Sequence, residues 1–317
     1  MLKSFRGIVP AIPIPLREDL RLDEPALRAF VRWLSAQPGI GGVVTNGHTG
    51  EVFALSREQR DQVTHVVADE VAGRVPVIAG VCCEGIDEAV DHASLAKEAG
   101  VSGLLVMPPH YWLRFGMQAS HVLDHFSAIG KAVRMPLVVH IYPAWTKASY
   151  SSELLAQLAQ IEEVTTFKIG TREMSKYDRD IRAIRASNPA CTILTCHDEY
   201  LLPTLVQGID GALVGFGSFV PEWIAALYEA VCRGDLKAAQ GIQDKLYRLK
   251  QVVYASDEPS GEAHARLKTA MMLAGRFPSN RMLPPVHAPS GATLERIRTA
   301  VEEAALTPIP EFAGALA

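Results

Sequence analysis

A lysine stands inside a short apolar stretch, residues 164–170, where a charged side chain is unusual. β-Branched and aromatic residues with a closing glycine are typical of a buried strand. Because side chains alternate along a strand, Lys168 shares one face with Thr166 and Gly170. Burial lowers the pKa of an ammonium group, and a neutral amine can attack a ketone to form a Schiff base. The stretch alone leaves a second interpretation open, in which Lys168 reaches solvent or pairs with a carboxylate.

Two other candidate groups stand near the ends of apolar runs. Tyr142 ends the run 136–142, and Thr49 follows the run 41–46. If these runs are parallel strands of a barrel, their carboxyl ends meet at one mouth, so Lys168, Tyr142 and Thr49 are expected to converge. An amine with a phenol and a hydroxyl suits Schiff-base chemistry, in which the phenol relays protons and the iminium is the electron sink.

The elements that must position these groups follow a repeated pattern. Strand-like and helix-like runs alternate eight times, with strands expected at 7–16, 41–46, 75–81, 103–107, 136–142, 164–170, 191–196 and 211–216. Eight such units with short links predict an α/β fold, a (β/α)8 TIM barrel. An open doubly wound sheet is less favoured because no G-x-G-x-x-G motif follows the first strand.

Two segments divide the chain. Residues 1–235 are expected to form the barrel that carries the active site. Residues 236–317 contain helix-like runs at 236–254, 262–274 and 293–305, which predict a C-terminal helical extension packed on the barrel.

Composition excludes several classes of partner. The chain has 317 residues, of which 48% are hydrophobic, and a net charge of −4, so nothing indicates a nucleic-acid or membrane partner. Five cysteines, an odd number without metal-finger spacing, predict reduced thiols in a cytoplasmic protein. No carboxylate and histidine set has metal-ligand spacing, so no metal site is predicted.

Several ordered motifs together are similar to one known family. The sequence resembles the dihydrodipicolinate synthase / N-acetylneuraminate lyase family of class I pyruvate aldolases over nearly its whole length. The motifs that carry this resemblance are Gly7-Ile8-Val9-Pro10-Ala11, Gly47-His48-Thr49-Gly50-Glu51, Val75-Pro76-Val77-Ile78-Ala79-Gly80-Val81, Pro108-Pro109-His110-Tyr111, Tyr142, Lys168 and Asp210-Gly211-Ala212.

The resemblance implies a mechanism, an assembly and a set of site residues. It implies that Lys168 forms a Schiff base with pyruvate or another 2-keto acid, that Tyr142 relays protons, and that no cofactor takes part. It also implies a homotetramer, a dimer of dimers, in which Thr49 links Tyr142 to Tyr111 of a neighbouring subunit. The backbone of three consecutive residues would hold the carboxylate of the 2-keto acid: Gly47, His48 and Thr49.

Departures from the family pattern concern the second substrate. His48 stands where the family usually has Ser or Thr, and Cys196 replaces a glycine near the substrate. Residues 143–147 contain no arginine to bind the aldehyde of the lysine-pathway synthase, although Lys147 could substitute. The favoured function is therefore a lyase, an aldolase or dehydratase, with an unknown second substrate. The alternatives are 4-hydroxy-tetrahydrodipicolinate synthase and a non-catalytic 2-keto-acid-binding barrel.

The remaining candidates concern specificity. His48 could be a general acid–base group, a substrate contact or a hydrogen-bonded spacer. His140 is expected to be a satisfied core histidine one layer below Tyr142. Substrate contacts are further expected from His110 and Gly215. Trp112 and Trp145 are expected to shape an aromatic-lined pocket. The loop residues His197, Asp198 and Glu199 could contact distal hydroxyls of a substrate or simply form a solvated loop.

Overall fold

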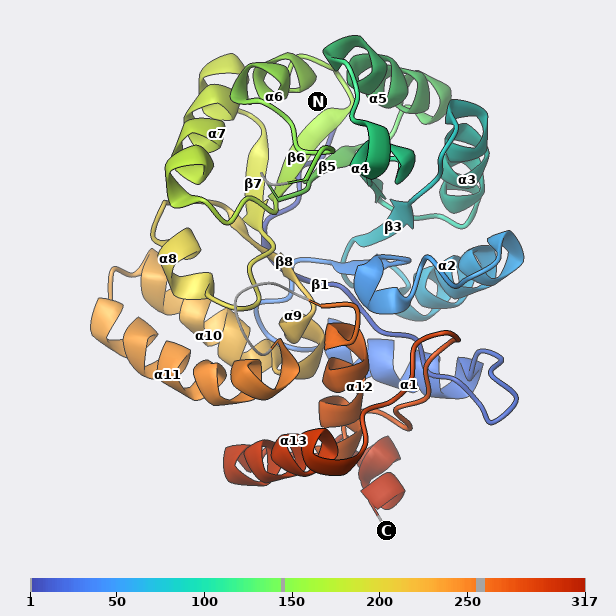
Figure 1. The fold of residues 1–317 in the computed structure, drawn as a ribbon, viewed down its shortest axis with the longest axis vertical. Coiled ribbons are helices and arrows are strands. Elements are labelled where there is room, and N and C mark those ends of the chain that lie inside the picture. Colours follow the sequence, from blue (N-terminus) through green and yellow to red (C-terminus); the bar gives the residue numbers. More distant parts are fainter. Residues whose placement is uncertain (1, 144–145, 255–259, 317) are drawn as a thin grey trace.

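Eight parallel strands form a nearly closed ring with helices around its outside (Figure 1). The computed structural model describes residues 2–143, 146–254 and 260–316. The architecture is a (β/α)8 TIM barrel with C-terminal helices, as predicted. The strands are β1 (Gly7–Pro10), β2 (Val43–Thr45), β3 (Val77–Val81), β4 (Gly103–Val106), β5 (Leu137–Ile141), β6 (Val164–Ile169), β7 (Thr192–Thr195) and β8 (Gly211–Val214).

The ring closes between its first two strands. Hydrogen-bonded neighbours run in the order β1-β8-β7-β6-β5-β4-β3-β2, and an isolated parallel bridge joins Ala11 to Val44. The predicted first strand, 7–16, is shorter in the structure and ends at Pro10. Pro13 and Pro15 follow it, and because proline lacks an N–H group the regular ladder cannot continue through them.

Alternation along the strands separates two cores. Inside the ring, side chains from seven strands pack with Phe5 and Ala11: Val9, Val44, Ile78, Leu105, Val138, Leu194 and Leu213. On β6, Phe167 and Ile169 belong instead to the outer core under the helices. Thr166 takes the inward position, where its hydroxyl lies 2.9 Å from that of Thr192. Lys168 shares this inward face, as the alternation predicts.

Helices cover the outside of the ring. A capping box starts one of them, with the Ser56 hydroxyl accepting from the Gln59 N–H and the Gln59 side chain accepting from the Ser56 N–H. The helices are α1 (Glu24–Ser35), α2 (Arg57–Val71), α3 (Ile86–Glu98), α5 (Ala119–Val133), α6 (Ser152–Leu158), α7 (Met174–Ser187), α8 (Leu201–Leu205) and α10 (Pro221–Cys232). Within the described ranges, no helix combines the length and apolar character needed to cross a lipid bilayer.

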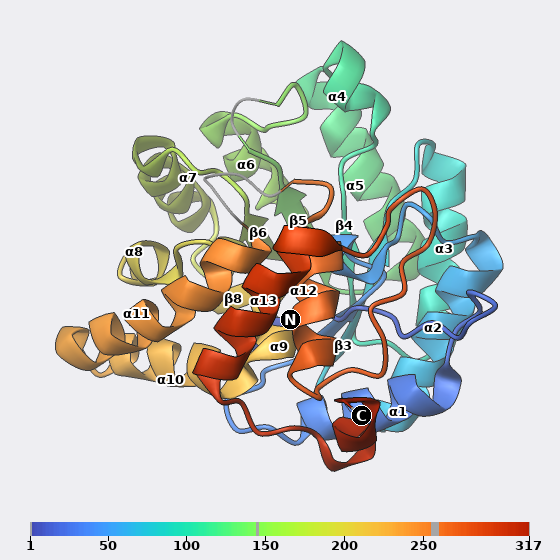
Figure 2. The same cartoon turned by 60° about the horizontal axis from the view of Figure 1, so that its bottom comes forward.

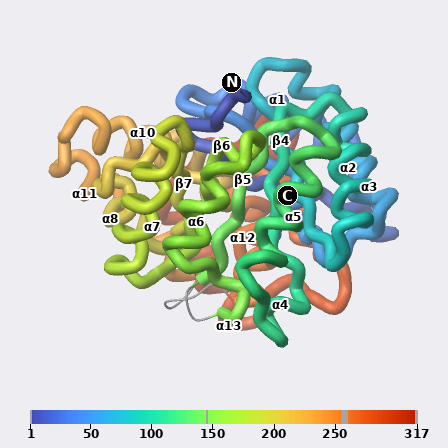
Figure 3. The backbone as a smooth tube through the Cα atoms, turned by 90° about the horizontal axis from the view of Figure 1, so that it is seen from above, coloured from blue at the N-terminus to red at the C-terminus, as the bar shows by residue number. Residues whose placement is uncertain are grey.

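Short elements that periodicity did not predict follow three of the strands. They are the 3₁₀ helix η1 (His48–Gly50) after β2, α4 (Tyr111–Phe115) after β4, and α9 (Phe216–Phe219) after β8. Each is too short to show a helical repeat in the sequence. The α4 helix projects beyond the body of the barrel (Figure 3), and it therefore presents side chains to solvent beside the strand ends.

The C-terminal segment packs against the barrel. It comprises α11 (Leu236–Val253), α12 (Ala263–Leu273), α13 (Gly291–Ala304) and η2 (Pro310–Leu316), and the first three lie side by side (Figure 2). A buried ion pair links Lys268 of α12 to Glu51, 2.6 Å apart, and Glu51 also accepts from the Leu283 N–H at 2.7 Å. Because Glu51 directly follows η1, this contact fixes the loop after β2.

Candidate active site

A cavity of about 280 Å³ opens at the carboxyl ends of the strands. Its lining includes the loops after β2, β5, β7 and β8, which is where a TIM barrel carries its active site. The side chains and backbone that line it are Ala11, Gly47, His48, Thr49, Leu105, Leu113, His140, Ile141, Tyr142, Pro143, Thr146, Lys168, Gly170, Arg172, Cys196, Asp198, Leu213, Gly215, Tyr254 and His264.

The side chain of Lys168 reaches this cavity from near the end of β6. Burial lowers the pKa of its ammonium group, and nearby Arg172 adds to that effect, whereas Cys196 and Asp198 oppose it. A lowered pKa enlarges the fraction of neutral amine, which is the form that attacks a carbonyl carbon. Lys168 is thus a candidate nucleophile with access to a ligand.

Tyr142, which lines the same cavity as Lys168, is hydrogen-bonded to His48. Its hydroxyl lies 2.9 Å from Nε2 of His48, and the side chain is almost fully buried. Burial holds the pKa of the phenol well above its ordinary value, so the phenol is protonated at neutral pH. The expected partner of this hydroxyl was Thr49, but the hydrogen bond observed among the described residues goes to His48.

His140 was expected to be a satisfied core histidine, and this prediction is wrong. The residue is buried, with 5% of its surface exposed, but it lines the cavity, and its Nδ1 has no hydrogen-bond partner among the described residues. Its ring lies 4.9 Å from that of Tyr142 and 5.2 Å from that of His48. The cavity therefore reaches one layer deeper than alternation along β5 could indicate.

Both histidines of this group are held neutral. Burial, followed by the charge of Lys168, lowers the pKa of His48 and that of His140 well below the ordinary histidine value of 6.5. Neutral imidazoles can accept a proton at one nitrogen and donate one from the other. The cavity thus has a proton-handling group beside its amine.

The loop after β2 presents backbone donors to the cavity. His48 and Thr49 are the first two residues of η1, so their N–H groups have no partner within that helix. Gly215, from the loop after β8, faces them closely, since a Cβ atom there would lie 3.2 Å from Oγ1 of Thr49 and 3.1 Å from the Tyr254 hydroxyl. A glycine at this position keeps the space beside the donors open.

The chain matches known proteins over nearly its whole length. A profile of the dihydrodipicolinate synthetase family matches residues 4–304. This chain belongs to that family. An uncharacterized DapA-like lyase of Thermofilum pendens is 32% identical over 87% of this chain and 89% of its own length. The 4-hydroxy-tetrahydrodipicolinate synthase of Maridesulfovibrio salexigens is 30% identical, covering 92% of this chain and 97% of its own.

Aldolases are also among the similar proteins. The probable 2-dehydro-3-deoxy-D-pentonate aldolase YjhH of Escherichia coli is 26% identical over 97% of this chain and all of its own length. The structure of YagE, an E. coli K12 protein of the dihydrodipicolinic acid synthase family in complex with pyruvate, superposes with a TM-score of 0.87. It is 26% identical and covers 96% of this chain and 100% of that one. Members of the dihydrodipicolinate synthetase family are class I aldolase-type lyases, and this chain is an enzyme of that type.

The loop after β7 contributes one of its three expected polar side chains to the cavity of this family member. Asp198 lines the cavity, and its carboxylate accepts from the Phe216 N–H at 2.6 Å. Burial raises the pKa of Asp198 to about 7. Glu199 pairs with Arg172 at 2.8 Å, whereas His197 is fully buried between the rings of Tyr177 and Tyr200. Contact of His197 with a substrate is therefore excluded by its packing.

Sequence reasoning did not identify three polar residues of the lining. Arg172 donates from Nη1 to the Gly170 carbonyl at 2.7 Å and from Nε to Glu199 at 2.8 Å. It lies just past the end of β6, so the rule that selects loops after barrel strands could have found it. Tyr254 and His264 come from the C-terminal segment, where no sequence signal points to the cavity. The active site is thus built by both segments of the chain.

The aromatic residues of α4 lie outside the cavity, although they were expected to shape it. Trp112 is buried in the outer core against His125, whereas its neighbour Tyr111, whose ring lies 6.0 Å from that of Trp112, is 45% exposed. Tyr111 and Phe115 lie one turn apart on this five-residue helix, and both are exposed. The expectation that Trp112 helps to shape an aromatic-lined pocket is therefore wrong. Trp145 lies outside the described residues.

His110 and Lys147 also stand apart from the cavity lining among the described residues. The His110 ring packs on Phe53 at 4.3 Å, and its backbone N–H donates to Glu84 at 2.9 Å. Phe53 in turn packs on His48 at 4.9 Å, so His110 is connected to the cavity wall only through another ring. Lys147 is exposed and donates to the Arg114 carbonyl at 3.2 Å. Its amine therefore forms its hydrogen bond outside the cavity lining.

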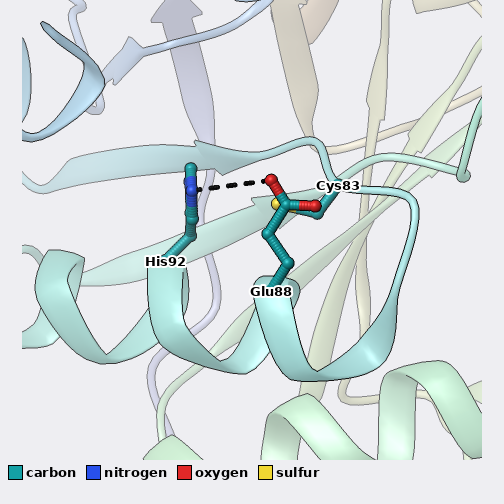
Figure 4. A group of neighbouring side chains, drawn as sticks. All are labelled: Cys83, Glu88 and His92. Atoms are coloured by element: carbon teal, nitrogen blue, oxygen red, sulfur yellow. Dashed lines mark ion pairs between the residues drawn. The ribbon is translucent and has the colours of Figure 1, made fainter. Parts of the chain in front are cut away.

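A group of possible metal ligands occurs away from the cavity. Cys83, after β3, lies with Glu88 and His92 of α3, their ligand atoms all within 4.8 Å of one another (Figure 4). Burial raises the pKa of the Cys83 thiol to about 12, so the thiolate that a metal needs is disfavoured. Burial lowers the pKa of His92, and the nearby Arg60 cation lowers it further. This arrangement is poorly suited to a cation, and none of the three residues lines the cavity.

Proposed function

We propose that this enzyme acts on pyruvate or a related 2-keto acid through a Schiff base on Lys168. The single observation that carries the proposal is the amine of Lys168, which enters the cavity with a lowered pKa and shares that cavity with the phenol of Tyr142. A buried amine of this kind is the group that forms an iminium with a ketone. The iminium is itself the electron sink, so the reaction needs no cofactor.

Each remaining site residue has a role in this mechanism. The backbone N–H groups of His48 and Thr49, with Gly47 before them, bind the carboxylate of the 2-keto acid, and Gly215 leaves room for it. Lys168 adds to the keto carbon, and Tyr142 delivers a proton to the oxygen that leaves as water. When a bond to C3 breaks, the iminium accepts its electron pair and becomes the enamine.

The rest of the substrate is proposed to be polar. It would be either the distal part of a larger 2-keto acid, which the enzyme cleaves or dehydrates, or an aldehyde that condenses with the enamine. Arg172, Asp198 and Tyr254 line the cavity with one cation, one titratable acid and one hydroxyl. Relatives include both aldolases and a synthase of the lysine pathway. The synthase activity is less favoured here, since residues 143–147 contain no arginine and Lys147 donates to the backbone of α4 instead.

We also propose a cytoplasmic homotetramer, a dimer of dimers. Exposed apolar side chains gather beside the cavity mouth on Phe53 and on α4, where Phe115 is 74% exposed. A patch of this kind is typical of an interface between subunits, and it includes Tyr111, which would then face a neighbouring subunit. All five cysteines are free, which suits a reducing compartment. Light scattering that gives a monomer would contradict the assembly.

Borohydride trapping tests the proposed function. We expect the protein to gain the mass of a reduced pyruvate adduct, and peptide mapping to find it on Lys168. The Lys168→Arg variant should gain no adduct and lose all turnover, while Lys131→Arg, a change at an exposed lysine of α5, should behave as the wild type. An adduct on another lysine, or none in the wild type, would overturn the proposal and favour a non-catalytic binding barrel.

A further inference from the structure

We propose that His48 completes the proton relay of Tyr142 within a single chain, in place of a tyrosine donated by a neighbouring subunit. The hydroxyl of Tyr142 lies 2.9 Å from Nε2 of His48, at hydrogen-bond distance. This inference rests on the proposed function, since Tyr142 must serve a Schiff base on Lys168 for its relay to matter.

The surroundings of His48 hold its ring in this geometry. The ring packs on Phe53 at 4.9 Å on one side and on His140 at 5.2 Å on another, and it meets Tyr142 edge-on, 5.6 Å between centroids at 69°. The residue lines the cavity and is only partly buried, so water reaches it while Tyr142 stays almost fully buried. His48 thus connects a buried phenol to solvent.

Among the described residues of the single chain, no hydrogen bond joins the Tyr142 hydroxyl to Thr49 or Tyr111. Thr49 carries the hydroxyl that would link Tyr142 to Tyr111, yet its Oγ1 lies beside Gly215, 3.2 Å from where a Cβ there would stand. Tyr111 is 45% exposed and is absent from the cavity lining, and its backbone N–H donates to Glu84 at 2.9 Å. His48 therefore occupies the hydrogen-bonding position that the hydroxyl relay would need.

The relay balances the protons of Schiff-base formation. A neutral amine and a ketone give a protonated iminium and water, so one proton must enter. Water delivers a proton to Nδ1 of His48, Nε2 releases its own proton to the Tyr142 oxygen, and the Tyr142 hydroxyl proton passes to the departing hydroxyl. The imidazole ends as its other tautomer, and the reverse sequence carries away the C3 proton of the iminium when the enamine forms.

The groups that face His48 keep its imidazole neutral, which the relay requires. They are Lys168 of β6, His264 of α12, His110 before α4, and His140 and Tyr142 of the β5 end. Burial, then the charges of Lys168, His264 and His110, lower the pKa of His48 well below 6.5. The imidazole therefore stays neutral at neutral pH, and protonation should stop the relay only at a pH well below 6.5.

Exchange of the C3 protons of pyruvate in D₂O, followed by NMR, tests the relay without a second substrate. His48→Gln keeps a hydrogen bond to Tyr142 but cannot pass a proton, so exchange should fall by about 10²–10⁴-fold while the borohydride adduct still forms at saturating time. His65→Gln, the same change at an exposed histidine of α2, should leave exchange unchanged. Tyr111→Phe should reduce exchange less than His48→Gln does.

A chemical rescue separates relay from folding. His48→Ala should recover exchange when free imidazole is added, and the recovery should follow the concentration of neutral imidazole. Recovery absent in a folded variant, wild-type exchange in His48→Gln, or a larger loss in Tyr111→Phe would each overturn the inference. No pyruvate adduct in the wild type would instead overturn the proposed function, so the two failures are distinguishable.

Discussion

Two walls of the cavity differ in charge, and Lys168 stands between them. The relay wall, His48, His140 and Tyr142, consists of groups whose pKa values are all displaced toward the neutral form. The charged wall comprises Arg172 with its ion-pair partner Glu199, and Asp198, whose pKa is raised to about 7. The relay wall comes from the ends of β2 and β5, whereas the charged wall comes from the loops after β6 and β7.

The difference teaches how the site divides its work. Proton transfer at the 2-keto acid can pass through neutral groups that accept one proton while they donate another, and the relay wall provides such groups. Recognition of a polar second substrate needs charged and hydrogen-bonding groups, and the charged wall provides those. Variants that damage one wall should therefore leave the function of the other measurable.

The largest effect is expected on the relay wall. Tyr142→Phe removes the hydroxyl that protonates the departing oxygen, so pyruvate exchange should fall by about 10²–10⁴-fold. Pyruvate affinity, measured by calorimetry, should stay close to that of the wild type because the carboxylate is held by backbone N–H groups. Near-normal exchange in this variant would show that the proton travels by another route.

A smaller effect on the chemistry, but a larger one on stability, is expected from the charged wall. Arg172→Gln removes one partner of a buried ion pair, which costs about 3–5 kcal/mol of unfolding free energy in typical cases. Denaturant titration measures this loss, and the double variant with Glu199→Gln should restore part of it. Pyruvate exchange per folded molecule should persist, and its abolition would show that the walls are not separate.

The charged wall should also give a pH signature. Burial raises the pKa of Asp198 from 3.8 to about 7, so between these values the folded protein keeps a proton that the unfolded chain releases. Asp198 therefore makes folding less favourable as pH rises through this window. We expect the Tm of Asp198→Asn to rise relative to that of the wild type as pH increases from 3.8 to about 7. Above this window the difference between the two Tm values should stay constant. A Tm of Asp198→Asn that falls relative to that of the wild type as pH rises would refute the assignment.

The smallest effect is expected at Lys147. Its amine donates to the backbone of α4 and does not line the cavity, so Lys147→Ala should leave condensation of pyruvate with aspartate semialdehyde unchanged. We expect that condensation to be poor in the wild type beside a panel of sugar-derived and aromatic 2-keto acids. A semialdehyde kcat/KM above the rest of the panel would assign the lysine-pathway synthase instead.

The sequence predicts the barrel and part of the relay wall, because both depend on local signals. A lysine within a β-branched run identifies β6, and the rule that strand ends meet at one mouth brings Lys168 and Tyr142 together. Alternation places His140 on the inward face, but it does not reveal how deep a cavity extends. Without that depth, His140 was assigned to the core, although it lines the site.

The charged wall depends on tertiary contacts that a sequence pattern does not encode. The pair Arg172–Glu199 joins the loops after β6 and β7, and nothing in either loop marks the other as its partner. Tyr254 and His264 reach the cavity because α11 packs beside α8 and α12 beside α9, contacts between segments distant in the chain. Trp112 was misassigned because a helix of five residues gives no periodicity from which to predict its buried face.

A crystal structure of the protein soaked with pyruvate tests the account most directly. We predict continuous density from Nζ of Lys168 to C2 of pyruvate, the carboxylate on the backbone N–H groups of His48 and Thr49, and the Tyr142 hydroxyl still bonded to His48. Pyruvate bound without a covalent bond, with its carboxylate on Arg172 and Lys168 unmodified, would contradict both the Schiff base and the division of the cavity into a relay wall and a charged wall.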